Sequence, residues 1–379
     1  MKTAVALAKC HSYDPETVSR ALDEALASIG GLQSFVKPGA SVLIKPNLLT
    51  DRSPERAATT HPEIVRAIVR RVRQIGGIPA IGESPAGILK IESVLEKTGF
   101  RALCESEKVP FIVLEKEPCL GRSFQGVSMA IARRALESDL VINVPKFKTH
   151  SFTIFTNAVK NVFGLLPGYQ KVMMHKFFPT PDRFGACLAF IYGAVRPALT
   201  VCDAVTVMEG GGPSCGTPLQ VGLLATSADG VALDIAMCRL LKINPRRVGY
   251  LNSLRGAGAG ETEWDNIEIA GDRANLENLP PVKLPAAATA ARLIPGGLLR
   301  LAQPLVWIAP SFLDSCTACG RCVAACPTGA LAIEGRLRPA LDRKKCIACC
   351  CCHENCPSNA VKMGGSPLLS FIAWCKSIG

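Results

Sequence analysis

The chain has 379 residues, of which 48% are hydrophobic and 20% are charged. This length exceeds what one core usually organises, so we expect two or more domains, and the composition suits a globular protein rather than a disordered one. The formal charge is +12, but no block interleaves basic and aromatic residues, so we expect a solvated basic surface and no nucleic-acid partner.

The N-terminal segment has an apolar run too short for a signal peptide, and no small-residue cleavage site follows it. The chain also contains 18 cysteines. In a secreted protein this number would suggest a disulfide framework, whereas in a reducing cytosol it indicates bound metal. We therefore expect a cytoplasmic protein whose thiols hold metal.

Short apolar runs alternate with helical patterns from residue 1 to about residue 275. The expected strands are residues 3–9, 41–47, 78–84, 110–115, 139–146, 198–205 and 221–226. The expected helices are residues 15–30, 62–75, 151–163, 183–195 and 231–241, the first capped by Asp14. Continuous apolar strands alternating with helices predict an α/β domain with a mostly parallel sheet covered by helices on both faces.

Residues 276–312 are rich in Pro, Ala and Leu. Their prolines, glycines and arginines argue against a membrane span, which needs about 20 apolar residues. We favour an ordered linker over a peripheral membrane contact. The final residues, 366–379, form an apolar tail that we expect to dock on the protein.

Two cysteine motifs lie between the linker and the tail. "CTACGRCVAACP" (316–327) has the spacing C-x2-C-x2-C-x3-C-P, and "KKCIACCCCHENCP" (344–357) fits the same spacing. Zinc favours separate tetrahedral sites, and neighbouring cysteines pair poorly as disulfides. The segment between the motifs predicts two short strands around a turn at Gly335.

The doubled motif resembles bacterial two-cluster ferredoxins, in which the cysteine before proline completes the other cluster. The resemblance implies two [4Fe–4S] clusters in a small α+β domain over residues 313–365. One cluster would use Cys316, Cys319, Cys322 and Cys356, and the other would use Cys346, Cys349, Cys352 and Cys326.

The second motif contains two additional cysteines. Cys350 and Cys351 fall between its second and third spaced cysteines, and we expect neither to be a ligand. Cys350 stands where the first motif has Gly320, at a point where the loop must turn tightly. We expect the Cys350 side chain to pack against the cluster.

Ligands of an open parallel sheet bind beyond the carboxyl ends of its strands. Several polar residues end the expected strands or lie in the segments that follow them. They are Asn47, Glu83, Ser84, Asn161, His175, Glu209 and Asp229. The tentative catalytic set is Lys45, Lys146, Lys148, His150, Lys160 and Asp203. We expect its lysines and histidine to share one edge and bind an anionic group. Asp203 and Glu209 would orient the lysines or hold a metal, and we favour orientation because no tight ligand spacing supports a metal site.

The stretches "VLIKPN", "NVPKFKTH", "AVKNVFG", "MEGGGPSCGTP" and "SADGVALDIA" resemble the family catalogued as domain of unknown function 362. Members often carry an appended two-cluster ferredoxin module. The resemblance implies an iron–sulfur, ferredoxin-type electron-transfer role but supplies no substrate.

The sequence thus favours an electron-transfer protein with a redox partner. One alternative is a ferredoxin-dependent reductase that acts on a small anionic substrate in the α/β pocket. Another is a redox sensor or scaffold with structural clusters.

Overall fold

A computed structural model gives the structure of the protein over residues 2–85, 89–272, 279–285, 307–335 and 337–366. The expected docking of the tail 366–379 and most of the expected linker 276–312 lie outside these residues. Among the described residues, no helix is long and apolar enough to cross a membrane.

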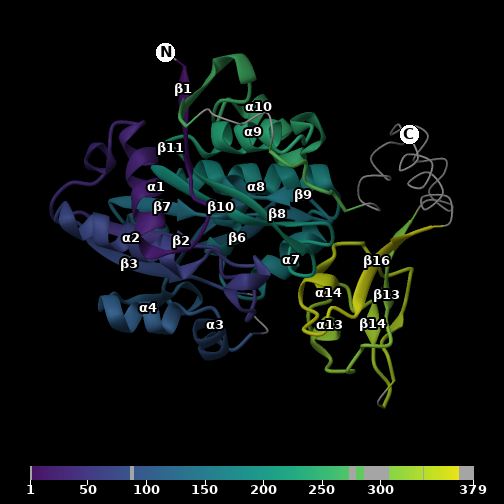
Figure 1. Cartoon of the computed structure of the whole chain (residues 1–379). Helices are drawn as coiled ribbons and strands as arrows, with labels where there is room; N and C mark the ends of the chain where they lie inside the picture. Colours follow the sequence, from purple (N-terminus) through teal and green to yellow (C-terminus); the bar gives the residue numbers. More distant parts are fainter. Residues whose placement is uncertain (1, 86–88, 273–278, 286–306, 336, 367–379) are drawn as a thin grey trace.

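The larger part of the chain forms one central sheet with helices on both sides (Figure 1). Its strands are β1 (Thr3–Lys9), β2 (Ser41–Pro46), β3 (Ile78–Glu83), β4 (Phe111–Val113), β7 (Leu140–Val144), β8 (Lys146–His150), β9 (Ile154–Thr156), β10 (Leu199–Glu209), β11 (Thr217–Ser227) and β12 (Ile267–Gly271). Its helices are α1 (Pro15–Ala27), α2 (Pro62–Gln74), α3 (Ile91–Lys97), α4 (Phe100–Glu107), α5 (Arg133–Glu137), α6 (Ala158–Asn161), α7 (Gln170–Phe177), α8 (Pro181–Val195), α9 (Gly230–Leu240) and α10 (Gly249–Ala257).

The strand order is β12-β1-β11-β10-β7-β2-β3-β4, with β8 beside β10 and β9 beside β8. Most neighbours are parallel, which confirms the expected fold class. The strand β11 is antiparallel to both β1 and β10, and β9 is antiparallel to β8. An apolar run has the same pattern in either direction, so the sequence did not reveal these reversals.

Neighbouring residues of a strand point to opposite faces of the sheet, and two cores follow from this alternation. Val42 and Ile44 pack in the core that contains α1, α2 and α4. Leu43, between them, packs in the core that contains α6, α8, α9 and α10. Both faces are therefore covered, as expected for continuous apolar strands.

The segment 151–163 differs from its expected helix. It contains the short strand β9, then α6, then a 3-10 turn at Val162–Leu165. Ile154 has a positive φ of 74°, which breaks the helical run and turns the chain back to pair with β8. His175, expected in a loop, lies on α7.

An additional hairpin joins β5 (Cys119–Phe124) to β6 (Val127–Ala132). Its two-residue turn has positive φ at both positions, 50° at Gln125 and 77° at Gly126. Such turns favour glycine, so the Gln-Gly pair was the signal for this hairpin.

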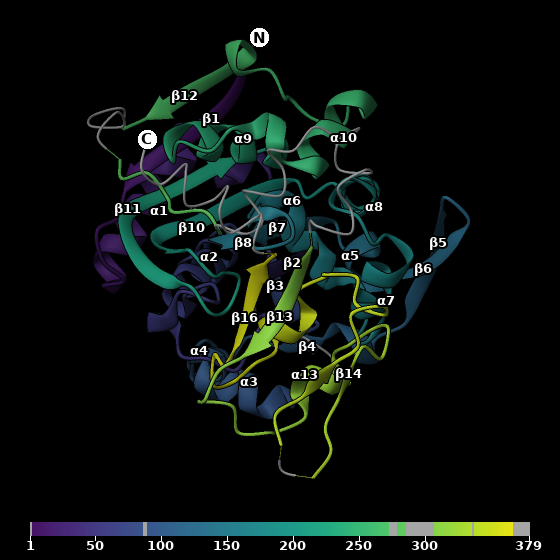
Figure 2. The same cartoon turned by 90° about the vertical axis from the view of Figure 1, so that its right-hand side faces the viewer.

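The C-terminal module lies against the α/β domain beside α7 (Figures 1 and 2). It contains β13 (Ile308–Phe312) paired with β16 (Val361–Gly365), β14 (Leu331–Ala332) paired with β15 (Ala340–Leu341), and the short helices α13 (Arg321–Ala324) and α14 (Cys351–Glu354). Gly335 turns between β14 and β15 with φ of 64°. Because β13 pairs with β16, residues 308–312 are a strand of this module and not part of the linker.

Candidate functional site

Each spaced cysteine set surrounds its own cavity. The first cysteine cavity has about 280 Å³ of empty space and is lined by Cys316, Cys319, Cys322 and Cys356. The second cysteine cavity has about 320 Å³ and is lined by Cys326, Cys346, Cys349 and Cys352. All eight cysteines are free thiols. Four convergent sulfurs around each space are the donor set that a [4Fe–4S] cluster takes.

The two cysteine loops have matching backbone conformations at two equivalent positions. Ala318 and Ala348 have φ of 51° and 52°, while Gly320 and Cys350 have φ of 75° and 67°. Cys350 thus adopts the left-handed conformation that its glycine counterpart adopts easily. Its side chain lines the second cysteine cavity.

The cysteines before proline are also matched. The Ala330 amide donates to Cys326 Sγ, and the Ala360 amide donates to Cys356 Sγ, both at 3.2 Å. Hydrogen bonds to sulfur favour the thiolate and help to set the potential of a bound cluster. The residues present therefore fit the group that the motif implies, at both cavities.

A larger space of about 740 Å³ lies where the module meets the carboxyl end of the sheet. We call it the interdomain pocket. Its wall from the α/β domain comprises Asn47, Leu48, Leu49, Glu83, Ser84, Pro85, Lys148, Thr156, Lys160, Asn161, Phe163, Gly164, Gly168, Lys171, Val172, His175 and Pro213. Its wall from the module comprises Cys351 and Glu354 of α14 and Asn355, the residue that follows α14. The Cys351 side chain therefore lines this pocket, whereas Cys350 lines the second cysteine cavity.

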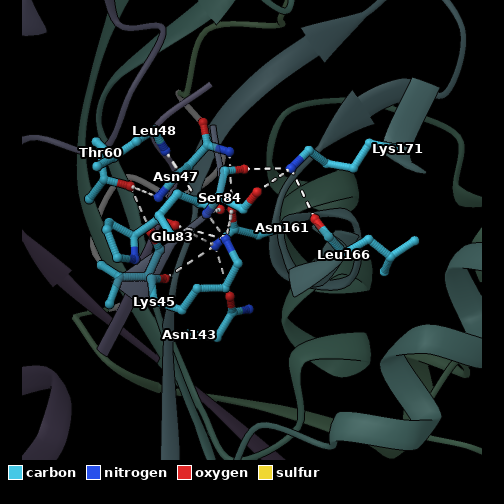
Figure 3. A network of polar contacts seen from close by, with 12 residues as sticks. Lys45, Asn47, Leu48, Thr60, Glu83, Ser84, Asn143, Asn161, Leu166 and Lys171 are labelled. Atoms are coloured by element: carbon cyan, nitrogen blue, oxygen red, sulfur yellow. Dashed lines mark hydrogen bonds and ion pairs between the residues drawn. The ribbon is translucent and has the colours of Figure 1, made fainter. Parts of the chain in front are cut away.

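Lys45 and Glu83 form a buried ion pair beneath the pocket (Figure 3). Lys45 Nζ lies 2.6 Å from Glu83 Oε2 and also donates to Pro46 O and Asn161 Oδ1. Burial lowers the pKa of Lys45, while Glu83 opposes this shift. All three ammonium hydrogens have protein acceptors, so this lysine fixes the strand ends.

Lys171 reaches the same network from α7 (Figure 3). Its ammonium donates to Ser84 O, Ser84 Oγ and Leu166 O at 2.6, 2.8 and 3.0 Å. Burial lowers its pKa to about 8, opposed by Glu83 and Glu115. Its donors are likewise fully used.

The two remaining lysines of the pocket have unused donors. Lys148 Nζ donates to Asn47 Oδ1 and Ala58 O, both at 2.6 Å. Within the described residues, Lys160 Nζ makes no hydrogen bond or ion pair and lies 5.7 Å from the ring centroid of Phe163. Burial lowers the pKa of both lysines, and their mutual repulsion adds to the shift of Lys148.

A histidine and a carboxylate meet across the two domains. His150 Nε2 lies 3.1 Å from Glu354 Oε1, and His150 Nδ1 accepts from the Phe152 amide. Burial lowers the pKa of His150 to about 4. Burial alone would raise the pKa of Glu354, but His150 and Lys160 lower it to about 2. At neutral pH the pair is a neutral imidazole beside a carboxylate.

His175 adds an unmet polar atom to this region. Its side chain is only 4% exposed, and its Nδ1 atom has no hydrogen-bond partner among the described residues. Burial lowers its pKa to about 3, so it is neutral at physiological pH.

Lys146 and Asp203 lie apart from the pocket lining. Lys146 Nζ lies 2.9 Å from Asp203 Oδ2 and 2.6 Å from Tyr13 Oη. Tyr13 donates to Asp203 Oδ1, and the His61 amide donates to Oδ2. Every group in this cluster has a partner, which is the pattern of a structural ion pair.

Two other acidic residues have structural partners elsewhere in the fold. Glu209 accepts from the Lys283 amide at 2.9 Å and contacts none of the lysines that it was expected to orient. Asp229 caps α9 through the Val231 and Ala232 amides.

The loop 208–218 contributes to the docking of the module on the α/β domain. Ser214 Oγ donates to Glu354 O at 2.7 Å. Arg52 donates to Cys356 O at 2.6 Å. These bonds hold the backbone of the second cysteine loop against the sheet edge and fix α14 over the interdomain pocket.

Sequence reasoning missed two residues of this site. Glu354 lies inside the second cysteine motif, and spacing alone gives no sign that it faces another domain. Lys171 lies on a short helix, and its partner Ser84 is 87 positions away. Both contacts arise from tertiary packing and have no local signature.

The comparisons with known proteins cover both domains. Residues 42–239 match the family described as "Domain of unknown function (DUF362)", and residues 312–332 match a 4Fe-4S binding domain. The second cysteine motif lies outside the latter match. A thylakoid-associated protein of Synechocystis sp. is 34% identical over 263 residues, which cover 69% of this chain and 82% of the relative.

Among solved structures, the lactate racemase apoprotein from Thermoanaerobacterium thermosaccharolyticum matches with a TM-score of 0.44 and 15% identity. The match covers 64% of this chain and 58% of that structure, so the chain spans little more than half of its length.

Proposed function

The chain belongs to the DUF362 family and carries a 4Fe-4S binding domain, and from this premise we propose that it is a two-cluster iron–sulfur protein that transfers electrons to a small anionic substrate in the interdomain pocket. The coarser part of this statement, an iron–sulfur protein with at least one 4Fe-4S cluster, follows from the domain match. The second cluster, the electron transfer and the substrate are the proposal.

The chain's own thiolates support two clusters. The first cysteine cavity would hold one and the second cysteine cavity the other, and bound clusters supply one-electron transfer. The matched amide-to-sulfur hydrogen bonds at Cys326 and Cys356 support the proposal that each cavity holds a cluster.

One observation favours a reductase over a simple electron carrier. The interdomain pocket is walled on one side by lysines of the sheet edge and on the other by α14. The residue after Cys351 is Cys352, which lines the second cysteine cavity. A substrate in the pocket would therefore be separated from that cavity by the short α14 segment.

The rival proposal is a sensor or scaffold in which the clusters are structural. The bonds between the loop 208–218 and α14 would serve that role equally well. The two proposals differ in whether the clusters cycle between redox states in the presence of a substrate.

We also retain a cytoplasmic location as a proposal, because the number of free thiols suits a reducing compartment. Cell fractionation with an antibody to the chain would test it, and recovery with the membrane fraction would contradict it.

Protein purified without oxygen should contain about eight iron and about eight sulfide per chain, because eight thiolates in two sets hold two cubanes. Colorimetric iron and sulfide determination on protein quantified by amino-acid analysis would measure this. A ratio of about four would leave only one working site.

The electron-transfer proposal is tested by anaerobic reduction of the purified protein. Candidate small organic acids are then added, and the visible absorbance and electron paramagnetic resonance of the clusters are followed. Reoxidation that depends on one acid and saturates with its concentration supports a reductase. Clusters that reduce but are reoxidised by no small molecule would favour a carrier, and clusters that never change state would favour the scaffold.

A further inference from the structure

The charges around the interdomain pocket do not balance. Lys45 and Lys171 are offset by Glu83 and Glu115, the carboxylates that oppose the burial shifts of their pKa values. The lining residues Lys148 and Lys160 then face a single carboxylate, Glu354. Two positive charges against one negative leave one positive charge, and a buried charge is costly unless it is paired.

The two lysines also lack acceptors for some of their N–H donors. Lys148 uses two of its three donors on Asn47 Oδ1 and Ala58 O. Lys160 uses none on any described residue, and its Nζ atom lies 5.7 Å from the ring centroid of Phe163. Four N–H donors on two ammonium groups therefore remain for a ligand.

We propose that the interdomain pocket binds a small organic acid through a single carboxylate held by Lys160 and Lys148. Reduction of that acid rests on the proposed function, whereas its binding does not. One carboxylate matches the single unbalanced charge, whereas a doubly charged phosphate would leave a buried negative charge.

The rest of the pocket suits an organic body. Leu48, Leu49, Phe163 and Val172 line it beside the lysines. The buried Nδ1 atom of His175, which lacks a protein partner among the described residues, offers a hydrogen bond to a second polar group. An apolar wall with few placed polar groups is the usual form of a small-molecule site.

Binding should take up protons. Burial lowers the pKa of Lys148 and Lys160 in the free protein, and a bound carboxylate favours their charged forms, which raises both pKa values. Calorimetry at a fixed alkaline pH in two buffers of different ionisation enthalpy would measure this uptake. Proton release on binding would contradict the assignment.

The decisive test uses oxidised, cluster-loaded protein, so that binding is measured without any electron transfer. Propionate and benzoate are titrated by calorimetry beside their uncharged amides, propionamide and benzamide, and beside inorganic phosphate. The acids should bind and the amides should not, because a neutral amide lacks the charge that the two ammonium groups require. Lys160→Gln should weaken binding of the acids about tenfold or more, since charge-assisted hydrogen bonds are lost.

The matched control is Lys176→Gln, which removes the same charge from an exposed position on α7. It should leave affinity unchanged, and Lys160→Arg should retain most of it. Equal binding of acids and amides, no binding of either acid, tighter binding of phosphate, or an unaffected Lys160→Gln protein would each overturn the inference.

The comparison of acids with amides uses the unaltered protein, so it holds even if a variant fails to fold. Acids that bind but never reoxidise the clusters would end the proposed function and leave this inference standing. Reoxidation by an anion that has no carboxylate, such as a sulfonate, with no binding of either acid would end this inference and leave the proposed function standing.

Discussion

Cys352→Ser should reduce the iron content from about eight to about four per chain, whereas Cys351→Ser should retain about eight. The two residues are neighbours, but Cys352 lines the second cysteine cavity and Cys351 lines the interdomain pocket. A serine hydroxyl is a poor replacement for the thiolate that binds a cluster, and it is a small change for a thiol that binds none. Iron and sulfide determination with absorbance spectroscopy would measure both variants.

The control for this pair is Cys350→Gly. Cys350 has φ of 67°, close to the 75° of Gly320 in the first loop, so glycine should adopt its backbone without strain. Both clusters should remain in this variant. Loss of iron from Cys351→Ser with full iron in Cys352→Ser would show that the spacing has been assigned in the wrong register.

The two loops illustrate what spacing can predict. The intervals between cysteines predicted which three of each motif would face one another, because three closely spaced residues must wrap a compact loop, and the resemblance to two-cluster ferredoxins implied the fourth. The structure places Cys326 with the second motif and Cys356 with the first, as the resemblance to two-cluster ferredoxins implies. Spacing did not reveal the outward direction of Cys351, since that depends on the domain packed against α14.

The sheet edge was predicted less completely. Lys148 and Lys160 line one pocket with Asn47, Glu83 and Asn161, and strand ends in an α/β sheet meet at one edge for topological reasons. The same reasoning grouped Lys146 with them, since it ends the strand that was expected at residues 139–146. What separates Lys146 is its partner Asp203 on β10, a pairing that no local pattern contains.

The pocket itself could not be derived from either domain alone. Its α/β wall comes from strand ends and α7, and its other wall comes from α14, about 200 residues further along the chain than Lys148. Its closure depends on side-chain contacts such as Ser214 to Glu354 O. A hydrogen bond between two surface loops leaves no periodicity in the sequence, so only the structure brings Glu354 beside His150.

Lys146→Met should destabilise the α/β domain strongly, by about 3 to 5 kcal/mol, because it leaves a buried carboxylate without its counter-charge. Lys146 and Asp203 are 1% and 0% exposed. Urea denaturation followed by circular dichroism would measure the change. Lys176→Met, which removes an exposed charge, should change stability by less than about 0.5 kcal/mol.

The double variant Lys146→Met, Asp203→Asn separates structure from catalysis. Asparagine removes the unpaired charge, and its side-chain oxygen can still accept from Tyr13 or from the His61 amide, which both bond Asp203. The second change should therefore recover part of the lost stability, and the two effects should be non-additive. Strictly additive losses would show that the pair is not coupled.

A different outcome would show that Lys146 acts on the substrate: Lys146→Met that folds with normal stability but abolishes substrate-dependent reoxidation of the clusters. A purely structural ion pair would affect reoxidation only through unfolding.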